Sequence, residues 1–532
     1  MEQNCKAISG SPSAPSPMAP DRAAIIQSLT SKVKTLFIEL DELRARSTKY
    51  LNKMDSKMMK LKMQLDKITK FLDPYLPLMN CHMVEFITDG HWYNLTPKNL
   101  RCSLEKYDIR QAVDLFFNIA NSNMQAKDVQ NHILYDFIQT AKSHRLKIDG
   151  QFCLSLQQFQ EKIVLWGGRL KPEIKIKEFM TDKKSYEVKT MAPLVAALQD
   201  VCMTTHCVDA GGGRGYLPIV LDLGYSVPSL AVDCDEIALK SGQRRNRLIV
   251  KRWPSIAKDT NLMFDRTVSN GTLHKFVHTF ITKDTRLGEI VKENFPEHSM
   301  DDVKLLLTGM HTCGNLGPSC IRAFLSQSEI TAIFNVPCCY HLLSEQIDGQ
   351  LWDVFERNYN IGSVPDFGFP MSQYLTGYQL GRNARMLASQ SIDRVVNLRQ
   401  IPSDNLFYRA LLQVIIKTHL PHKAIPERRL KRLTKCQSFE EYFKMADAAL
   451  NLSLYDNVGS GYLTDLHAKY EKEHYNLVLF YLLRLCFAQV VESVILLDRL
   501  LFLFENGFEN AFLVALFDPT LSPRCHGVVA LK

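Results

Sequence analysis

The sequence has no uninterrupted hydrophobic run long enough to cross a membrane. Its most apolar stretch, residues 475–504, is broken by the charged residues Arg484, Glu492, Asp498 and Arg499. Because charges are costly at bilayer depth, this stretch is predicted to form packed core helices instead of a membrane span. The beginning of the sequence is Ser/Pro/Ala-rich and lacks the apolar segment of a secretory signal. We therefore expect no membrane partner.

The cysteines indicate in which compartment the protein resides. Fourteen of them accompany no export signal, and disulfides are rare in reducing compartments. The thiols are expected to be free and the protein intracellular, either cytoplasmic or nuclear.

The composition is that of a globular protein. Hydrophobic residues make up 46% and charged residues 23%, which excludes wholesale disorder, collagen and a coiled-coil rod. A length of 532 residues suits two or three domains. Lys+Arg total 64 against 56 Asp+Glu, a net charge of +8. This mild bias permits an acidic partner such as RNA without requiring one.

Patterns of composition and periodicity divide the chain into six segments, and no internal repeat is seen. They are a disordered tail (1–21), a long amphipathic helix (22–73), a mainly helical region (74–180), an α/β core (181–384), a helical insert (385–506) and C-terminal strands that return to the core sheet (507–532).

The segment 22–72 carries an apolar stripe at alternating three- and four-residue steps. The stripe changes phase after Met54, which is the mark of a stutter. One interpretation is a coiled coil that binds a second copy or a partner protein. The other, which we favour, is an amphipathic helix that lies on its own protein.

The core alternates short apolar strands with helical segments. This alternation predicts a Rossmann-like α/β fold, with a parallel sheet covered on both faces and with residues 507–532 supplying final edge strands. The predicted strands are Thr204–Ala210, Ser229–Asp233, Lys275–Thr282, Val303–Thr308 and Ile330–Val336.

A glycine-rich loop follows the first of these strands. Asp209 lies where the strand ends, and Gly211, Gly213 and Gly215 let the backbone turn tightly and approach a ligand. A dinucleotide fingerprint would require glycine at position 216, where the residue is Tyr216. The nicotinamide interpretation is therefore weakened.

The spacing Asp-x-Gly-x-Gly-x-Gly resembles instead the first motif of class I S-adenosylmethionine-dependent methyltransferases. Asp233 ends the next strand, where a carboxylate can accept both ribose hydroxyls of an adenosyl cofactor. Lys184 and Glu187 lie just upstream of the first strand, where such domains close over the methionine end of the cofactor. Thr282, at the end of the third strand, is assigned to the same site.

Several motifs together resemble the methyltransferase-like protein 25 family, of which one branch is named ribosomal RNA adenine dimethylase domain-containing protein. They include Asp209–Leu217, Gly309–Leu316, Cys338–Tyr340, Gly368–Tyr374 and Gly381–Ala388. The resemblance runs from about Phe71 to the C-terminus and implies a class I methyltransferase whose substrate is unsettled. The His-x-Cys-Gly and Cys-Cys-x-His elements are more distantly similar to tRNA 2′-O-ribose methyltransferases, an analogy that favours RNA.

Loops after the fourth and fifth strands are expected to overhang the cofactor. They hold His311 with Cys313, and Asn335 through His341. Three interpretations remain open. The residues shape the acceptor pocket, with His311 or Tyr340 orienting or deprotonating the acceptor. Alternatively they bind zinc, although adjacent cysteines do not readily reach one ion. The third interpretation is buried thiols and a core histidine. The site is predicted without a metal.

Known methyl-transfer motifs match this region poorly. Asn335 through Tyr340 is a stretched version of the Asn-Pro-Pro-Tyr motif of amine methylation. Cys338, after a proline, is similar to the nucleophile of cytosine C5 methylation. We assign His311, Asn335, Cys338, Cys339 and Tyr340 to catalysis and leave the acceptor atom open.

Two basic runs are candidate RNA contacts. The first contains Arg244, Arg245, Arg247, Lys251 and Arg252, and the second spans residues 428–435. No recognisable RNA-binding module accompanies them. The sequence thus predicts an S-adenosylmethionine-dependent methyltransferase that modifies a base or ribose of RNA. A protein methyltransferase and a non-catalytic scaffold acting through its N-terminal helix are the alternatives.

Overall fold

The computed structural model describes residues 34–35, 54–121, 130–259, 272–297, 303–345, 366–422, 430 and 436–532. The chain separates into two units, residues 1–60 and 61–532. In the first unit the described residues are helical. The predicted disordered tail, most of the segment 22–53 and nearly all of the basic run 428–435 lie outside the described residues.

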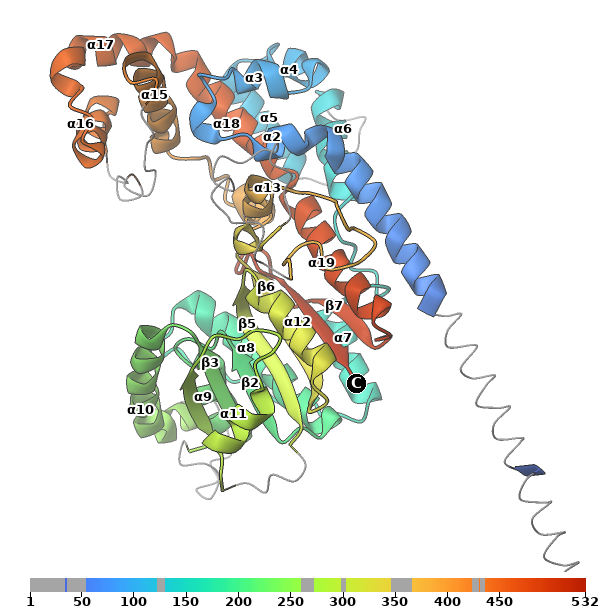
Figure 1. Cartoon of the computed structure of the whole chain (residues 1–532). Helices are drawn as coiled ribbons and strands as arrows, with labels where there is room; N and C mark the ends of the chain where they lie inside the picture. Colours follow the sequence, from blue (N-terminus) through green and yellow to red (C-terminus); the bar gives the residue numbers. More distant parts are fainter. Residues whose placement is uncertain are drawn as a thin grey trace, which may run out of the picture. The chain divides into compact units, whose positions relative to one another are not determined.

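The second unit is built around one eight-stranded sheet (Figure 1), in the order β1-β7-β8-β6-β5-β2-β3-β4. Its strands are β1 (Cys153–Ser155), β2 (His206–Ala210), β3 (Ser229–Asp233), β4 (His274–His278), β5 (Leu305–Cys313), β6 (Ile330–Cys338), β7 (Ala511–Ala515) and β8 (His526–Leu531). All neighbours are parallel except β8, which is antiparallel to both β6 and β7.

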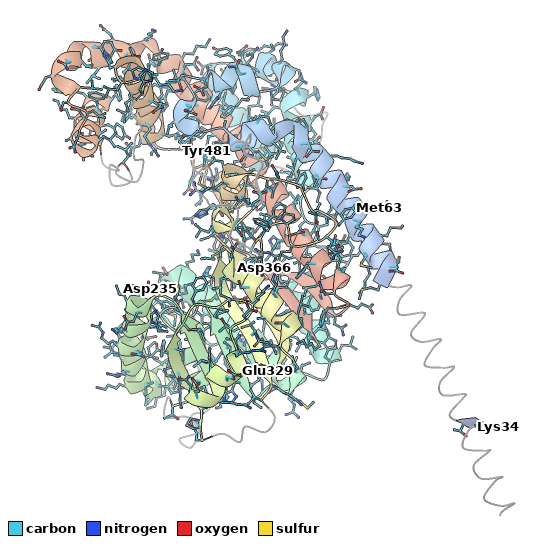
Figure 2. All side chains as sticks on the ribbon, viewed as in Figure 1. Lys34, Met63, Asp235, Glu329, Asp366 and Tyr481 are labelled. Carbon is cyan, nitrogen blue, oxygen red and sulfur yellow. The ribbon has the colours of Figure 1, made fainter. Side chains whose placement is uncertain are left out.

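The strand order reverses at β2, which makes the carboxyl end of this strand a topological switch point. Going along the chain, the sheet grows from β2 outward through β3 to β4, and then returns to add β5 on the other side of β2. Ligands of open α/β sheets bind at such a switch point. Figure 2 labels a residue at each end of the parallel strands. Asp235 lies just after β3, at the carboxyl ends of the strands, and Glu329 lies just before β6, at their amino ends.

Helices cover both faces of the sheet, which is why its strands are continuous apolar runs instead of alternating ones. One core is shared by the strands with α7, α8, α9 and α10, while α11, α12 and α19 lie on the other face (Figure 1). These helices are α7 (Leu156–Leu165), α8 (Asp182–Cys202), α9 (Tyr216–Tyr225), α10 (Glu236–Asp259), α11 (Leu287–Asn294), α12 (Leu316–Ser326) and α19 (Ala488–Glu505).

The remaining helices come from two distant segments of the chain that pack together. Helix α5 contacts α18, and α2 contacts α13, while α15, α16 and α17 share a small core of their own. Their bounds are α2 (Leu76–Asn80), α3 (His91–Leu95), α4 (Lys98–Leu104), α5 (Ile109–Asn121), α6 (His132–Ser143), α13 (Arg382–Leu387), α14 (Ile392–Asn397), α15 (Asp404–His419), α16 (Phe439–Leu450), α17 (Tyr455–Lys469) and α18 (Glu471–Leu485).

The fold class agrees with the sequence prediction, but several details differ. The segment 74–180 contributes β1, which sequence patterns did not indicate because a three-residue strand is too short to show periodicity. Since β1 pairs with β7, it forms the edge of the sheet, and the C-terminal strands lie inside it. The third predicted strand ends at His278, so Thr282 lies beyond it.

The most apolar part of the chain is a core element. Residues 471–505 are long and apolar enough to cross a membrane, but 89% of their most apolar window is buried inside the fold. Burial within the protein therefore accounts for the apolar character of α18 and α19.

The described end of the N-terminal helix also packs on its own protein. Leu61, Leu65 and Leu72 are completely buried. The Phe71 ring lies 5.8 Å from that of Phe487, and the Tyr374 hydroxyl donates to Asp66 at 2.7 Å. For residues 61–72, the apolar stripe is thus covered by the chain itself.

Candidate functional site

The glycine-rich loop joins the end of β2 to the start of α9. Gly211, Gly213 and Gly215 have φ values of +70°, +49° and +63°, a region that strains other residues. The Gly211 N–H donates to the Val232 carbonyl at 2.9 Å, which ties the loop to β3. The three predicted glycines therefore form a tight turn at the carboxyl edge of the sheet.

Asp233, the last residue of β3, faces this loop. Its Oδ2 accepts from the Gly213 N–H at 2.9 Å, and its Oδ1 accepts from the Asp235 N–H at 2.8 Å. A carboxylate oxygen has two lone pairs, so both oxygens can still accept from a ligand hydroxyl. The two backbone contacts fix the carboxylate in position for that role.

Two exposed apolar side chains follow the ends of β3 and β4. Ile237 is 81% exposed and Phe280 is 71% exposed, and the Thr279 N–H donates to the Asp233 carbonyl at 3.0 Å. The loop that carries Phe280 is therefore anchored beside Asp233. Sequence analysis missed both apolar residues, since a single surface isoleucine or phenylalanine carries no motif.

Asp209 is the buried acid of the site. It is 3% exposed, and its Oδ1 has no hydrogen-bond partner among the described residues. Burial raises the pKa of Asp209 to about 7, opposed by the charge of Lys184 and reinforced by that of Asp233. An unsatisfied buried acceptor costs about 1–3 kcal/mol, so an amine or cationic ligand would relieve a real penalty here.

A buried arginine of α10 holds the glycine loop in place. Arg245 is 8% exposed, and its Nη2 donates to the carbonyls of Arg214 at 3.0 Å and Gly215 at 3.1 Å. Its guanidinium also lies over the Tyr216 ring, 4.0 Å from the centroid. The sequence prediction that Arg245 contacts RNA is therefore wrong, because the residue is enclosed by the loop that it supports.

Glu187 lies in the second turn of α8, completely buried. Its Oε2 accepts from His311 Nε2 at 3.0 Å and from Lys184 Nζ at 2.9 Å, and its Oε1 accepts from the Ser522 hydroxyl at 2.8 Å. Burial opposes ionisation, but the hydrogen bond and charge of His311, together with Lys184, outweigh it and hold the pKa of Glu187 well below its usual range. Ser522 was missed because 335 residues separate it from Glu187.

Replacing Glu187 with Gln is expected to destabilise the protein by about 2 kcal/mol at pH 7, because the variant keeps the shape but leaves Lys184 without its buried countercharge. The folded-state pKa of Glu187 is depressed, so its stabilisation is present above its ordinary value of 4.5 and is lost as the pH falls further. Urea unfolding from pH 7 to pH 4 measures this. The gap between wild type and variant should stay constant to about pH 5 and then shrink; a gap that grows on acidification would contradict the assignment.

Two of the residues predicted to face the methyl acceptor, His311 and Tyr340, differ in their exposure to solvent. His311 is partly exposed at the end of β5, with 26% of its side chain accessible. Tyr340 is completely buried, and its hydroxyl donates to Glu492 on α19 at 2.9 Å. This contact gives Tyr340 a packing position instead of the predicted place beside an acceptor, since its hydroxyl is enclosed and already paired.

Asn335 is buried near the end of β6, next to β5. A Cβ on Gly309 would lie 2.7 Å from Asn335 Oδ1, so the glycine makes room for this amide. Neither amide atom has a partner of good hydrogen-bond geometry among the described residues, although Asn335 interacts with the Cys320 thiol and lowers its pKa against the larger opposing effect of burial. Asn335 thus holds unused hydrogen-bonding capacity close to β2.

Cys338 and Cys339 meet a third thiol, that of Cys313. The Sγ atoms of Cys313 and Cys338 lie 2.9 Å apart, those of Cys313 and Cys339 lie 3.4 Å apart, and those of Cys338 and Cys339 lie 3.7 Å apart. The register of β5 and β6 pairs Cys313 with Cys338 directly. The cluster stands at the same carboxyl edge as the glycine loop.

Thr282 is exposed in the loop after β4, where its backbone N–H donates to Thr285 Oγ1 at 2.9 Å. Its hydroxyl accepts from the Asp284 N–H at 3.2 Å. These contacts shape the turn, and the assignment of Thr282 to the cofactor site stays a prediction.

Comparison with known proteins agrees with this geometry. The model of a methyltransferase-domain family matches residues 183–346, which contain the glycine loop, Asp233 and the thiol cluster. The chain contains a methyltransferase domain. It is 27% identical to probable methyltransferase-like protein 25 of Mus musculus, over 88% of this chain and 96% of that protein. The corresponding human protein is 26% identical, over 89% of this chain and 97% of its own length.

These findings confirm the resemblance to the methyltransferase-like protein 25 family that the sequence motifs indicated, and with it the Rossmann-like fold class. No solved structure gives a significant match to the chain. The identification of the methyltransferase domain therefore rests on sequence similarity and on the geometry of the site.

Proposed function

We propose that the protein is an S-adenosylmethionine-dependent methyltransferase that binds its cofactor at the carboxyl ends of β2 and β3 and methylates RNA. The observation that carries the cofactor assignment is the unpartnered, buried Oδ1 of Asp209 beside the glycine loop. A cationic amine, which the methionine end of this cofactor carries, fits an acceptor that the protein leaves unsatisfied. The acceptor oxygens of Asp233 fit the hydroxyls of its ribose in the same way.

The chain's own residues divide the binding among them. The glycine loop leaves space for the cofactor backbone, Asp233 accepts from ribose hydroxyls, and Asp209 accepts from the amine. Ile237 and Phe280 offer apolar surface to the adenine ring, whose faces are flat and poorly hydrated. The bound cofactor supplies a methyl group on a sulfonium, which an in-line nucleophile can take directly.

His311 is the residue that we assign to the acceptor proton. Glu187 is held ionised, so it accepts from Nε2–H of His311 and leaves Nδ1 as the basic nitrogen. A carboxylate that orients an imidazole in this way stabilises the imidazolium formed when Nδ1 takes a proton. Glu187 is accordingly a positioning residue, and His311 the general base for a hydroxyl or amine acceptor.

The support for RNA is a basic stripe on α10. Arg244, Arg247 and Lys251 are exposed and recur at three- and four-residue steps, so they share one face of the helix. Among the described residues none of the three forms an ion pair with an acid, which leaves their charge available to phosphates. The stripe lies on the helix that begins just after Asp233, close to the proposed cofactor site.

Reversing this stripe tests the RNA assignment. The variant Arg244→Glu/Arg247→Glu/Lys251→Glu should bind single-stranded RNA at least about tenfold more weakly and lower the salt dependence of log K by about 2, as expected for the loss of three phosphate contacts. Fluorescence anisotropy at several salt concentrations measures both quantities.

A matched control carries the same charge change elsewhere. Lys98, Lys106 and Lys147 are exposed in the helical region, and their change to Glu should leave RNA binding unaffected. Equal loss in both variants, or no enrichment of RNA crosslinks in cells over an unrelated protein, would contradict an RNA acceptor. Methyl label recovered only in protein would identify a protein methyltransferase instead.

A further inference from the structure

The thiols of Cys313, Cys338 and Cys339 form a compact cluster at the ends of β5 and β6. All three Sγ atoms lie within 4.8 Å of one another. Thiolates bound to one zinc ion at about 2.3 Å in a tetrahedron stand about 3.8 Å apart. Two of the observed separations, 3.4 and 3.7 Å, are close to that value, and the third, 2.9 Å, would need to widen. The triangle of sulfur atoms is therefore nearly the size of one face of a tetrahedral zinc site.

Backbone conformation is what brings adjacent cysteines to the same side. Cys339 has φ +49° and ψ +50°, the left-handed region that a residue with a side chain adopts at a cost. In extended backbone Cys338 and Cys339 would point to opposite faces, whereas this turn folds the second thiol back toward the first. Neighbouring cysteines can therefore share one ion here, because the strained backbone at Cys339 directs its thiol toward that of Cys338.

The surroundings fit a negatively charged centre. The guanidinium of Arg524 lies within electrostatic range of both Cys313 and Cys339. Three thiolates and a divalent ion carry a net charge of −1, which this guanidinium offsets. Cys313 is exposed, so an ion can enter from solvent.

His341 supplies a candidate fourth ligand two residues beyond Cys339. Its Nδ1 is buried and has no hydrogen-bond partner among the described residues. Neutral imidazole and thiolate are the ligands that zinc prefers in structural sites. His341 is not among the ligand atoms that lie within 4.8 Å of one another, so its side chain would have to turn toward the thiols to complete a site of three cysteines and one histidine.

We propose that Cys313, Cys338 and Cys339 bind one zinc ion, with His341 at the fourth position, and that the ion ties the end of β5 to the end of β6 beside the acceptor side of the domain. The proposal goes beyond the methyl-transfer function and does not depend on it. Binding releases the thiol protons to solvent, so the affinity falls as the pH is lowered.

The test is metal binding by the full chain purified under reducing conditions. After equilibration with zinc and desalting, elemental analysis should find about one ion per wild-type chain. With cobalt in place of zinc, thiolate-to-metal charge-transfer bands and the visible bands of tetrahedral cobalt should appear. The Cys313→Ser and Cys339→Ser variants should lose more than about 100-fold in affinity, beyond what changes outside the ligand shell usually cost.

Cys102→Ser is the matched control, since Cys102 is an exposed thiol on α4, away from the cluster. It should bind like the wild type. Circular dichroism establishes that each variant is folded, and His341→Ala should shift the cobalt visible bands while retaining the thiolate bands.

Three results would overturn the proposal. They are no cobalt spectrum from folded wild-type protein, undiminished zinc in the folded Cys313→Ser/Cys339→Ser double variant, and visible cobalt bands unchanged by His341→Ala. Mass spectrometry after alkylation distinguishes a zinc site from a pair of cysteines that forms a disulfide. A stoichiometric Cys313–Cys338 disulfide in protein that binds no metal would identify the cluster as a redox pair instead.

Discussion

Replacing Gly213 with Arg is expected to abolish cofactor binding. A Cβ at this position starts 3.5 Å from Asp233 Oδ2, so the new guanidinium would pair with that carboxylate and fill the space proposed for the ribose. Wild-type protein at a cofactor concentration about 100 times Kd gains about 2.7 kcal/mol in stability. The variant should gain none, and thermal unfolding with and without S-adenosylmethionine measures the difference.

The control must reproduce the backbone strain without touching the site. Gly507 has φ +86° and nothing within 4 Å of an added Cβ, so Gly507→Arg places the same side chain in open space. It should be stabilised by the cofactor as much as the wild type. If both variants respond alike, the glycine loop is not the binding site.

The second large effect concerns Asp209 and pH. The carboxyl is mostly protonated below its pKa of about 7, and pairing with a cationic amine requires it to lose that proton. Cofactor affinity of the wild type should therefore rise about tenfold from pH 6 to pH 8 and level off above. The charge of Lys184 opposes the rise in the pKa of Asp209, and the charge of Asp233 adds to it.

Asp209→Asn should bind weakly and with a flat pH profile, because the amide carries no titratable proton. Calorimetry in two buffers of different ionisation enthalpy counts the protons. Near pH 6 the wild type should release about one proton on binding, and the variant none. A wild-type affinity independent of pH would contradict the role of Asp209.

The same substitution makes a prediction for stability. Since the pKa of Asp209 is raised in the folded state, the acid lowers stability as the pH rises from its ordinary value of 3.8 toward 7. Asp209→Asn removes this penalty, and at pH 8 the variant should be at least as stable as the wild type. Weak binding by such a variant cannot then be attributed to misfolding.

The cofactor side of the site was accessible from sequence because its parts are local. Gly211, Gly213 and Gly215 lie between Asp209 and Asp233 within one βαβ unit, and each of the five residues has a position-specific physical role. Asp209 and Asp233 lie where the alternation of strand and helix placed them. Short-range patterns of this kind determine both the turn and its neighbours.

The rest depended on contacts that no local pattern encodes. Ser522 reaches Glu187 from the segment between β7 and β8, and Arg245 turns inward from a run of basic residues that otherwise faces solvent. The left-handed turn at Cys339 is unusual for a cysteine. Because sequence analysis assumes ordinary backbone there, it underestimated how closely the three thiols approach.

Calorimetric titration of S-adenosylmethionine into the purified full chain tests whether the carboxyl ends of β2 and β3 bind the cofactor. We expect a single site per wild-type chain and no heat of binding with folded Gly213→Arg or Asp233→Ala protein. No binding by folded wild-type protein at millimolar cofactor would contradict this expectation, and would leave a methyltransferase fold that serves as a scaffold.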